Sequence, residues 1–374
     1  MEGEDSMEEI TRCIEQAAAI LDRTAGVSDQ SGVVVACTDS SRVGSVNKLA
    51  AEIFASDDAF AVTGETSYMK FGTGDAFEYV CFIEGTDQSA QINLELLVNW
   101  LKTVVKEEDQ NDEREALLKN ILLENELPGD IPLKAREYSI PYAAMRVVYV
   151  VRVAEENNLD SLEVMRSMFP NRKIDFVLAM DENNIALVKE FNRGADEEIG
   201  EVASQIQDTL IAESMASVKI AIGMPTETLK DCAKSFREAT LALTIGGIFN
   251  PEKSIIRYDK LGLGRLIYQL PPTLCKMFLD EVFVDGSYEE LDLETLTTID
   301  TFFDNDLNGS ETSRQLFVHR NTLVYRLDKA HKITGLDVRQ FEDAVLFKLA
   351  TMVRRYLEYL QKTTEKNSNK WWKA

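Results

Sequence analysis

The sequence predicts an α+β protein of several domains, in which strands and helices alternate up to about residue 264 and only helices follow. Two observations favour this fold class. Of the 374 residues, 45% are apolar and 28% are charged, which suits two or three globular domains with buried cores. Short apolar runs typical of strands lie between stretches with helical spacing, and these runs cease after Gly264.

The first region mixes short strands with helices. Helical spacing predicts helices over residues 6–25 and 43–55, and apolar runs predict strands over residues 32–37, 59–62 and 77–83. A long helix begins near Ser89. The charged stretch 106–115 has no Pro or Gly and leads into the apolar stretch 116–123, so we expect one helical connector rather than a disordered linker.

The middle region begins after Pro128, Gly129 and Pro132, and its elements follow a βαββαβ-type order. That order predicts a sheet with helices on one face, a ferredoxin-like α+β sandwich. The predicted strands cover residues 145–153, 175–180, 185–190, 217–223 and 254–258, and the predicted helices cover residues 161–168, 197–213 and 227–245.

The last region is predicted to be helical over residues 266–283 and, with brief interruptions, over residues 291–360. We expect the tail that follows to be disordered, although its Trp371 and Trp372 among lysines could contact DNA or a partner. The resulting segments are residues 1–106, 107–135, 136–262, 263–361 and 362–374.

The charge is distributed unevenly along the chain. The net charge is −24, which argues against a protein that coats nucleic acid or an anionic membrane with its whole surface. Residues 309–374, however, hold 13 Lys and Arg against 7 Asp and Glu, a charge of +6 that leaves −30 for residues 1–308. This asymmetry indicates that the C-terminal end contacts a polyanion.

The cysteines, histidines and apolar runs exclude several kinds of site. Five Cys residues without a CxxC pair indicate thiols in a reducing cytosol, and only His319 and His331 could serve a His-based metal site or a Ser-His-Asp triad. The N-terminus lacks the features of a signal peptide, and Arg146 and Arg152 interrupt the most apolar stretch. We expect a cytoplasmic protein without a membrane span, metal or cofactor.

Residues 308–335 have the spacing of a helix-turn-helix. The short first helix carries Ser313. A small residue is needed at this position, because two helices that cross steeply over a short turn leave no room for a large side chain. Leu316 and Val318 are expected to be buried at the turn, and a second helix begins near His319. At 100° per residue, the inward stripe of this second helix consists of Leu323, Leu327 and Ala330.

The opposite face of the second helix carries groups suited to a DNA major groove. Asn321, Tyr325, Asp328 and Lys332 lie opposite the stripe, Thr322 and Lys329 flank them, and Arg320 lies at the helix start. Asp328 would repel phosphate, so we expect it to lie away from the DNA backbone or to orient Arg320 or Lys332. The alternative is a solvated face on a helical packing module, but the spacing and the local charge favour DNA binding.

The stretch TSRQLFVHRNTLVYRL, residues 312–327, followed by KITGLD, closely resembles the C-terminal helix-turn-helix of the PucR and carbohydrate-diacid-regulator family of bacterial transcription factors. One departure is Ser313, where the family usually has alanine. The resemblance implies a sequence-specific regulator that binds double-stranded operator DNA. We predict DNA contacts from Thr312, His319, Arg320, Asn321, Thr322, Tyr325, Arg326 and Lys329.

The middle region also resembles that family, since residues 220–246 are similar to its central domain, a relative of GGDEF diguanylate cyclase domains. In an active cyclase, the hairpin between two strands carries the GGDEF signature, whose acids hold metal and activate a hydroxyl. Here the hairpin is Asp181-Glu182-Asn183-Asn184, without glycine. We therefore expect turn residues and no enzyme activity, with a nucleotide cyclase as the alternative.

The first region resembles the family's sugar-diacid recognition domain over residues 33–50. The resemblance implies a PAS-like α/β sensor in which Arg42 could grip a carboxylate and Gly44 permits a close backbone approach. Arg42, Gly44 and Asn47 are the candidate ligand-binding residues, and Asn47 stands where the family has a histidine. The alternative is that Arg42 is a surface residue that caps the next helix.

Together these inferences describe a transcriptional regulator with an effector sensor, a helical connector, a catalytically silent GGDEF-like domain and a helix-turn-helix. We expect a homodimer because one recognition helix covers only a few base pairs. Residues 89–105 and 115–123 are the candidate dimer seam, although the same stripe could pack on its own sheet. The competing function is an interaction module whose C-terminal helices bind protein instead of DNA.

Overall fold

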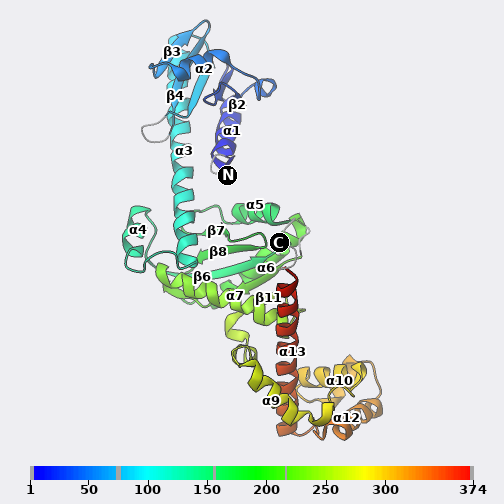
Figure 1. Cartoon of the computed structure of the whole chain (residues 1–374). Coiled ribbons are helices and arrows are strands. Elements are labelled where there is room, and N and C mark those ends of the chain that lie inside the picture. The colour runs from blue at the N-terminus through cyan, green and yellow to red at the C-terminus, as the bar shows by residue number, and fades with distance from the viewer. Residues whose placement is uncertain (1–3, 73–76, 155–156, 215–216, 371–374) are drawn as a thin grey trace. The chain divides into compact units, whose positions relative to one another are not determined.

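The computed structural model describes residues 4–72, 77–154, 157–214 and 217–370 of the chain (Figure 1). Trp371 and Trp372 of the predicted tail lie outside the described residues. The chain divides into two compact units. The first comprises Met1–Tyr142 with Asn171–Ile174, and the second comprises Ala143–Pro170 with Asp175–Ala374.

The first unit is built on a five-stranded antiparallel sheet with the strand order β2-β1-β5-β4-β3. Its strands are β1 (Ala25–Ser28), β2 (Val34–Cys37), β3 (Phe60–Thr63), β4 (Thr66–Phe71) and β5 (Tyr79–Glu84). Alternate side chains of β5 serve two cores. Cys81 and Ile83 share a core with α1 (Glu4–Ala18) and α3 (Gln88–Leu122), whereas Val80 and Phe82 share one with α2 (Lys48–Ala55).

Two strands of this sheet were not predicted from the sequence. The helix expected over residues 6–25 ends at Ala18, and β1 begins at Ala25, while β4 lies in a stretch for which no element was expected. All four residues of β1 are buried, so the strand shows no alternation of apolar and polar residues. Gly26 in β1 permits close packing, since a Cβ there would lie 2.6 Å from the Phe82 ring.

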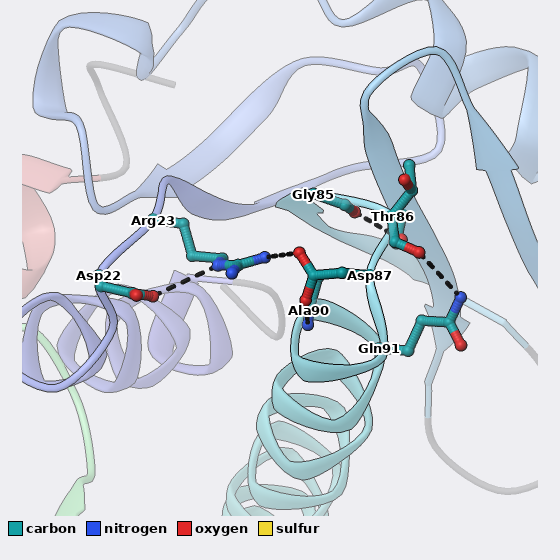
Figure 2. Close-up of polar contacts among 8 residues, drawn as sticks. Asp22, Arg23, Gly85, Thr86, Asp87, Ala90 and Gln91 are labelled. Atoms are coloured by element: carbon teal, nitrogen blue, oxygen red, sulfur yellow. Dashed lines mark hydrogen bonds and ion pairs between the residues drawn. The ribbon is translucent and has the colours of Figure 1, made fainter.

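α3 is one continuous helix of 35 residues, which confirms the prediction of a helical connector. Asp87 caps its start by accepting a hydrogen bond from the Ala90 N–H at 3.0 Å, and Arg23 donates to the same carboxylate at 2.7 Å (Figure 2). The Arg23 guanidinium holds the pKa of Asp87 below its usual range. Gly85 leaves room for this contact, because a Cβ there would lie 2.3 Å from the guanidinium. The segment before β1 is thereby fixed to the start of α3.

Much of the apolar stripe of α3 is buried. Leu94 and Leu101 belong to the core that α3 shares with α1, and Leu118 and Ile121 near the helix end are at most 2% exposed. Most of the stripe thus packs within the chain, as the alternative expects. Ile92 and Leu123 are 49% and 46% exposed, so the dimer seam stays a prediction. A short helix, α4 (Ile131–Glu137), follows α3.

The second unit begins with a six-stranded sheet in the order β11-β9-β6-β8-β7, in which β10 also pairs with β6. Its strands are β6 (Ala143–Arg152), β7 (Phe176–Ala179), β8 (Asn184–Glu190), β9 (Lys219–Ile222), β10 (Thr226–Thr228) and β11 (Ile255–Arg257). The helices beside the sheet are α5 (Asn158–Met168), α6 (Asp196–Ser214) and α7 (Cys232–Phe249). Every strand and helix predicted for this region is present, and β10 is additional.

Helices pack against both faces of this sheet, so the prediction of helices on one face is wrong. Val147 and Tyr149 of β6 share a core with α5 and α6, whereas Val150 shares one with α7. Ser235 of α7 is tied to the sheet, because its Oγ accepts a hydrogen bond from the Val148 N–H at 3.1 Å. The five central residues of β6 are at most 2% exposed, and a strand that is apolar on both sides needs cover on both sides.

The remainder of the second unit is helical. Its helices are α8 (Leu263–Ile267), α9 (Pro272–Val282), α10 (Leu293–Asp304), α11 (Gly309–Gln315), α12 (Arg320–Thr334) and α13 (Phe341–Lys370). The single helix predicted over residues 266–283 is broken before Pro271 and Pro272, because proline cannot continue a helix. α13 continues to Lys370, so the prediction of a disordered tail from residue 362 is wrong up to that residue.

α13 contributes to two cores along its length. Val353 and Tyr356 pack in the core that contains Leu243 of α7, whereas Phe347 packs in the core of the helix-turn-helix. The helix-turn-helix is therefore supported by the helix that follows it in the chain.

Candidate nucleic-acid interface

Local caps set the ends of the two helices of the helix-turn-helix, α11 and α12. Asn308 caps α11 by accepting hydrogen bonds from two backbone N–H groups of the first turn, at 3.1 and 3.3 Å. The chain turns at Phe317, whose φ is +53°. His319 caps α12, since its Nδ1 accepts a hydrogen bond from the Asn321 N–H at 3.2 Å, and Gly335, with φ of +77°, ends the helix.

The inward stripe of α12 is the one that the sequence predicts. Leu323, Leu327 and Ala330 are at most 2% exposed, and they share one core with Phe302 of α10 and Phe347 of α13. This confirms the rotation of α12 deduced from its sequence. The orientation of its other side chains follows from that rotation.

The first helix and the turn differ from expectation at three residues. Leu316 and Val318 are half-buried rather than buried. Thr312 is 0% exposed, and its hydroxyl donates to the Asn308 carbonyl at 2.8 Å. Because α11 packs against both α10 and α12, Thr312 lies inside the module. The prediction that Thr312 contacts DNA is therefore wrong.

One flank of α12 is occupied by α10. Arg326 donates from Nη1 to Thr298 Oγ1 at 3.2 Å and forms an ion pair with Glu294. Lys329 forms an ion pair with Asp292, whose carboxylate also caps α10 by accepting from a backbone N–H. The Lys329 ammonium holds the pKa of Asp292 well below its usual range. Arg326 and Lys329, both predicted DNA contacts, are thus already bound to acids of their own module.

The rest of the outward face is exposed. It includes Arg320, Asn321, Thr322 and Tyr325, of which the tyrosine is 68% exposed. Within the described part of the chain, Arg320 and Lys332 are the Lys and Arg residues of α12 that form no ion pair. Their charges are therefore available to phosphate.

Two further residues complete this face. Val324, absent from the predicted contacts, is 39% exposed. Its position 100° from Leu323 on the helix indicates this exposure, whereas its apolar side chain gives no sign of a polar DNA contact. Asp328 pairs with Arg339 at 2.9 Å and does not orient Arg320 or Lys332. The other expected position, away from the DNA backbone, stays a prediction.

Comparisons with known proteins agree with this geometry. Residues 295–353 match the family model described as the PucR C-terminal helix-turn-helix domain, and residues 124–245 match the model of a GGDEF-like domain. The chain belongs to the PucR and carbohydrate-diacid-regulator family.

Three curated relatives of this PucR-family chain are named as regulators. The purine catabolism regulatory protein of Bacillus subtilis is 27% identical over 41% of this chain and 29% of its own length. The proline-responsive transcriptional activator PutR of the same organism is 26% identical over 49% of this chain and 46% of its own length. The carbohydrate diacid regulator of Escherichia coli is 26% identical over 63% of this chain and 64% of its own length. The alignments thus span less than two thirds of each relative.

The hairpin of the GGDEF-like domain is an ordinary turn in this PucR-family chain. The Asp181 carboxylate accepts hydrogen bonds from the N–H groups of Asn183 at 2.9 Å and Asn184 at 3.0 Å. This is the turn role predicted for Asp181. Among the described residues, no group of three or more His, Cys, Asp or Glu could hold a metal ion, and no helix is long and apolar enough to cross a membrane.

The predicted ligand residues of the first unit lie between β2 and α2. The helix expected over residues 43–55 begins only at Lys48, because Asn47 caps α2 by accepting from the Ala50 N–H at 3.2 Å. Arg42 caps no helix with its side chain. It pairs with Glu84 at 2.8 Å, with its guanidinium 5.4 Å from the centre of the Phe82 ring. Gly44 has φ of +79°, and open space surrounds it.

Proposed function

We propose that this PucR-family chain is a sequence-specific DNA-binding transcriptional regulator. The observation that carries the proposal is the exposed face of α12, where Arg320, Asn321 and Tyr325 project from a helix held by a buried stripe. Arginine and asparagine side chains can form paired hydrogen bonds with guanine and adenine edges in the major groove. The charge of +6 on residues 309–374 supplies the attraction to phosphate.

The experiment that tests this proposal is selection of genomic DNA fragments by the full chain at several salt concentrations. The test variant combines Arg320→Ala with Asn321→Ala. The matched control combines Asn192→Ala with Arg193→Ala, an exposed pair of the same residue types outside the helix-turn-helix. We expect selective enrichment by the wild type and the control, a steep fall of binding with salt, and loss of enrichment in the test variant.

The opposite outcomes point to other functions. Equal enrichment by the test variant contradicts the assignment of the α12 face, and no enrichment at any salt concentration favours the protein-interaction module. Formation of a cyclic dinucleotide from GTP and magnesium, abolished by Asp181→Ala with Glu182→Ala, would favour the cyclase instead. The family relatives are named as regulators, which supports the non-enzymatic reading of the hairpin.

The regulator acts as a homodimer in this proposal, because two half-sites multiply the affinity and specificity of one recognition helix. The exposed apolar residues of α3, Ile92, Leu96 and Leu123, remain the candidate dimer surface. Sedimentation equilibrium should give a mass twice the 42.1 kDa of one chain. A mass of one chain at concentrations that bind operator would contradict the dimer.

The first unit serves as the PAS-like sensor of a small carboxylate, such as a sugar diacid. A sheet with helices on both faces supports this role, and two of the relatives are named for proline and for carbohydrate diacids, both carboxylates. Arg42 already holds the Glu84 carboxylate, which an effector carboxylate would replace beside Gly44 and Asn47. Effector binding then changes, through α3, how the two helix-turn-helix units of the dimer are placed. It does so because the effector binds one of two arrangements of the dimer more tightly than the other.

Calorimetry with aldarates and amino acids tests the sensor. Arg42→Ala should abolish the heat of binding, whereas Arg12→Ala, another arginine of the first unit in an exposed ion pair, should leave it unchanged. Binding that survives Arg42→Ala would contradict the role of Arg42. An operator affinity that is the same with and without a bound effector would contradict the coupling.

A further inference from the structure

The exposed face of α12 contains one apolar side chain that its own module does not use. Val324 is 39% exposed, although its neighbour Leu323 is 2% exposed and belongs to the core. Val324 lies one turn after Arg320 and one turn before Asp328, so polar and charged residues precede and follow it on the same side of the helix. Burial within the chain does not account for a valine at this position.

The opposite flank of α12 shows which side of the helix is open to DNA. Arg326 and Lys329 on that flank are bound to Glu294 and Asp292 of α10, so the charges of this flank cancel and it offers phosphate little attraction. A duplex therefore approaches the side that carries Arg320, Asn321 and Val324. Val324 lies in the second turn of α12, within the part of a recognition helix that contacts base edges.

The major groove offers one apolar group to such a side chain, the C5 methyl group of thymine. Valine suits this contact because it is short and its branched Cβ restricts χ1, so its two methyl groups are held in place. Along the helix axis, Val324 lies about 4.5 Å beyond Asn321, and base pairs are spaced by about 3.4 Å. The two side chains thus meet the same or neighbouring base pairs.

We propose that Val324 is a specificity-determining residue that contacts a thymine methyl group next to an adenine bonded by Asn321. The side-chain amide of asparagine is matched to N6 and N7 of adenine. Each operator half-site accordingly contains an A·T pair bonded by Asn321 and, at the same or the next step, a thymine in contact with Val324. This inference rests on the proposed DNA-binding function.

The test removes the methyl group from the DNA and the side chain from the protein. Duplexes selected from a random pool by the full chain provide the operator, and each thymine is then replaced by deoxyuridine, which lacks only the methyl group. The proteins are the wild type, Val324→Ala and the matched control Val345→Ala. Val345 is a helical valine of α13 that is 38% exposed and lies outside the recognition helix.

In each half-site we expect one thymine whose replacement by deoxyuridine weakens wild-type binding about fourfold. A fourfold loss of affinity corresponds to the burial of one methyl group. Val324→Ala should bind the thymine operator about fourfold or more weakly and should no longer distinguish thymine from deoxyuridine at that position. Val345→Ala should behave as the wild type. Circular dichroism of the variants shows whether each retains its helices.

Three outcomes would overturn the inference. Selected operators without a constant thymine, or a penalty for deoxyuridine that persists in Val324→Ala, would do so while leaving the DNA-binding proposal intact. If the full chain selects no DNA sequence at all, and Val324→Ala instead abolishes binding to a protein partner, both proposals fail together. The first two results are therefore distinguishable from failure of the proposed function.

Discussion

Arg326→Ala separates two roles for one side chain, a DNA contact predicted from the sequence and an internal tie between α12 and α10. The Arg326 side chain is 19% exposed, donates to Thr298 Oγ1 at 3.2 Å and pairs with Glu294, which is 75% exposed. Loss of a charged donor to a buried hydroxyl costs about 1.5–3 kcal/mol, and an exposed ion pair adds at most about 1 kcal/mol. We expect the helix-turn-helix to lose about 2–3 kcal/mol of its free energy of opening.

Hydrogen exchange in the full chain measures this loss in peptides that cover residues 309–334. Arg326→Ala should lower amide protection there by roughly 30- to 140-fold, and the slope of log binding constant against log salt should stay at its wild-type value. The matched control is Arg320→Ala, which removes an exposed arginine without an ion pair from the same helix. It should keep wild-type protection but reduce the magnitude of the salt slope by about 0.9.

The reverse pattern would refute the reasoning. If Arg326→Ala retained wild-type protection and reduced the magnitude of the salt slope by about one, the guanidinium would be a phosphate contact. The ion pair with Glu294 would then have no role in holding α12.

Two further predictions concern the stability of the helical part. Phe347→Ala should lower the free energy of unfolding in urea by about 3–5 kcal/mol, because the centre of its buried ring lies 5.4 Å from that of Phe283 and 6.2 Å from that of Phe303. Phe341, on the same helix, is 71% exposed, so Phe341→Ala should change that free energy by less than about 0.5 kcal/mol. Equal losses in the two variants would contradict the position of Phe347 in the core. The Lys329 and Arg339 side chains lower the pKa values of Asp292 and Asp337, so their stabilisation is present above about pH 4 and is lost as the pH falls towards the folded-state values. The urea concentration at the unfolding midpoint should therefore be lower at pH 3 than at pH 5. Asp337→Asn should make this difference in midpoint smaller, and an unchanged difference would contradict the role of Asp337.

The helix-turn-helix could be predicted from the sequence because its determinants are local. The caps Asn308 and His319 lie at most three residues from the N–H groups they bind, and the stripe of Leu323, Leu327 and Ala330 follows from helical periodicity alone. Arg326 shows where such reasoning stops. Its partner Glu294 lies 32 residues earlier in the chain, and nothing in the periodicity of α12 indicates that an acid of another helix occupies that flank.

The first unit was harder to predict because its strands are short and two of them, β1 and β5, are buried on both faces. β1 shows no alternation, and the apolar residues of α3 suit a dimer seam as well as a sheet. Only the tertiary contacts show which of these residues pack on the sheet, since the sequence pattern satisfies both uses. The same limit explains why helices were wrongly predicted on only one face of the second sheet. The order of elements predicts a sheet, but it does not predict on which face α7 packs.

The ion pairs of α10 also bear on how a chain with a net charge of −24 approaches DNA. At physiological ionic strength, charges more than about 8 Å from the duplex are largely screened, so the acids that matter are those beside α12. Asp292 and Glu294 are such acids, and Lys329 and Arg326 neutralise them. These two ion pairs therefore leave little net charge on the flank of α12 that faces α10. In the proposed function, the attraction to phosphate rests on cations that form no ion pair, which on α12 are Arg320 and Lys332 among the described residues.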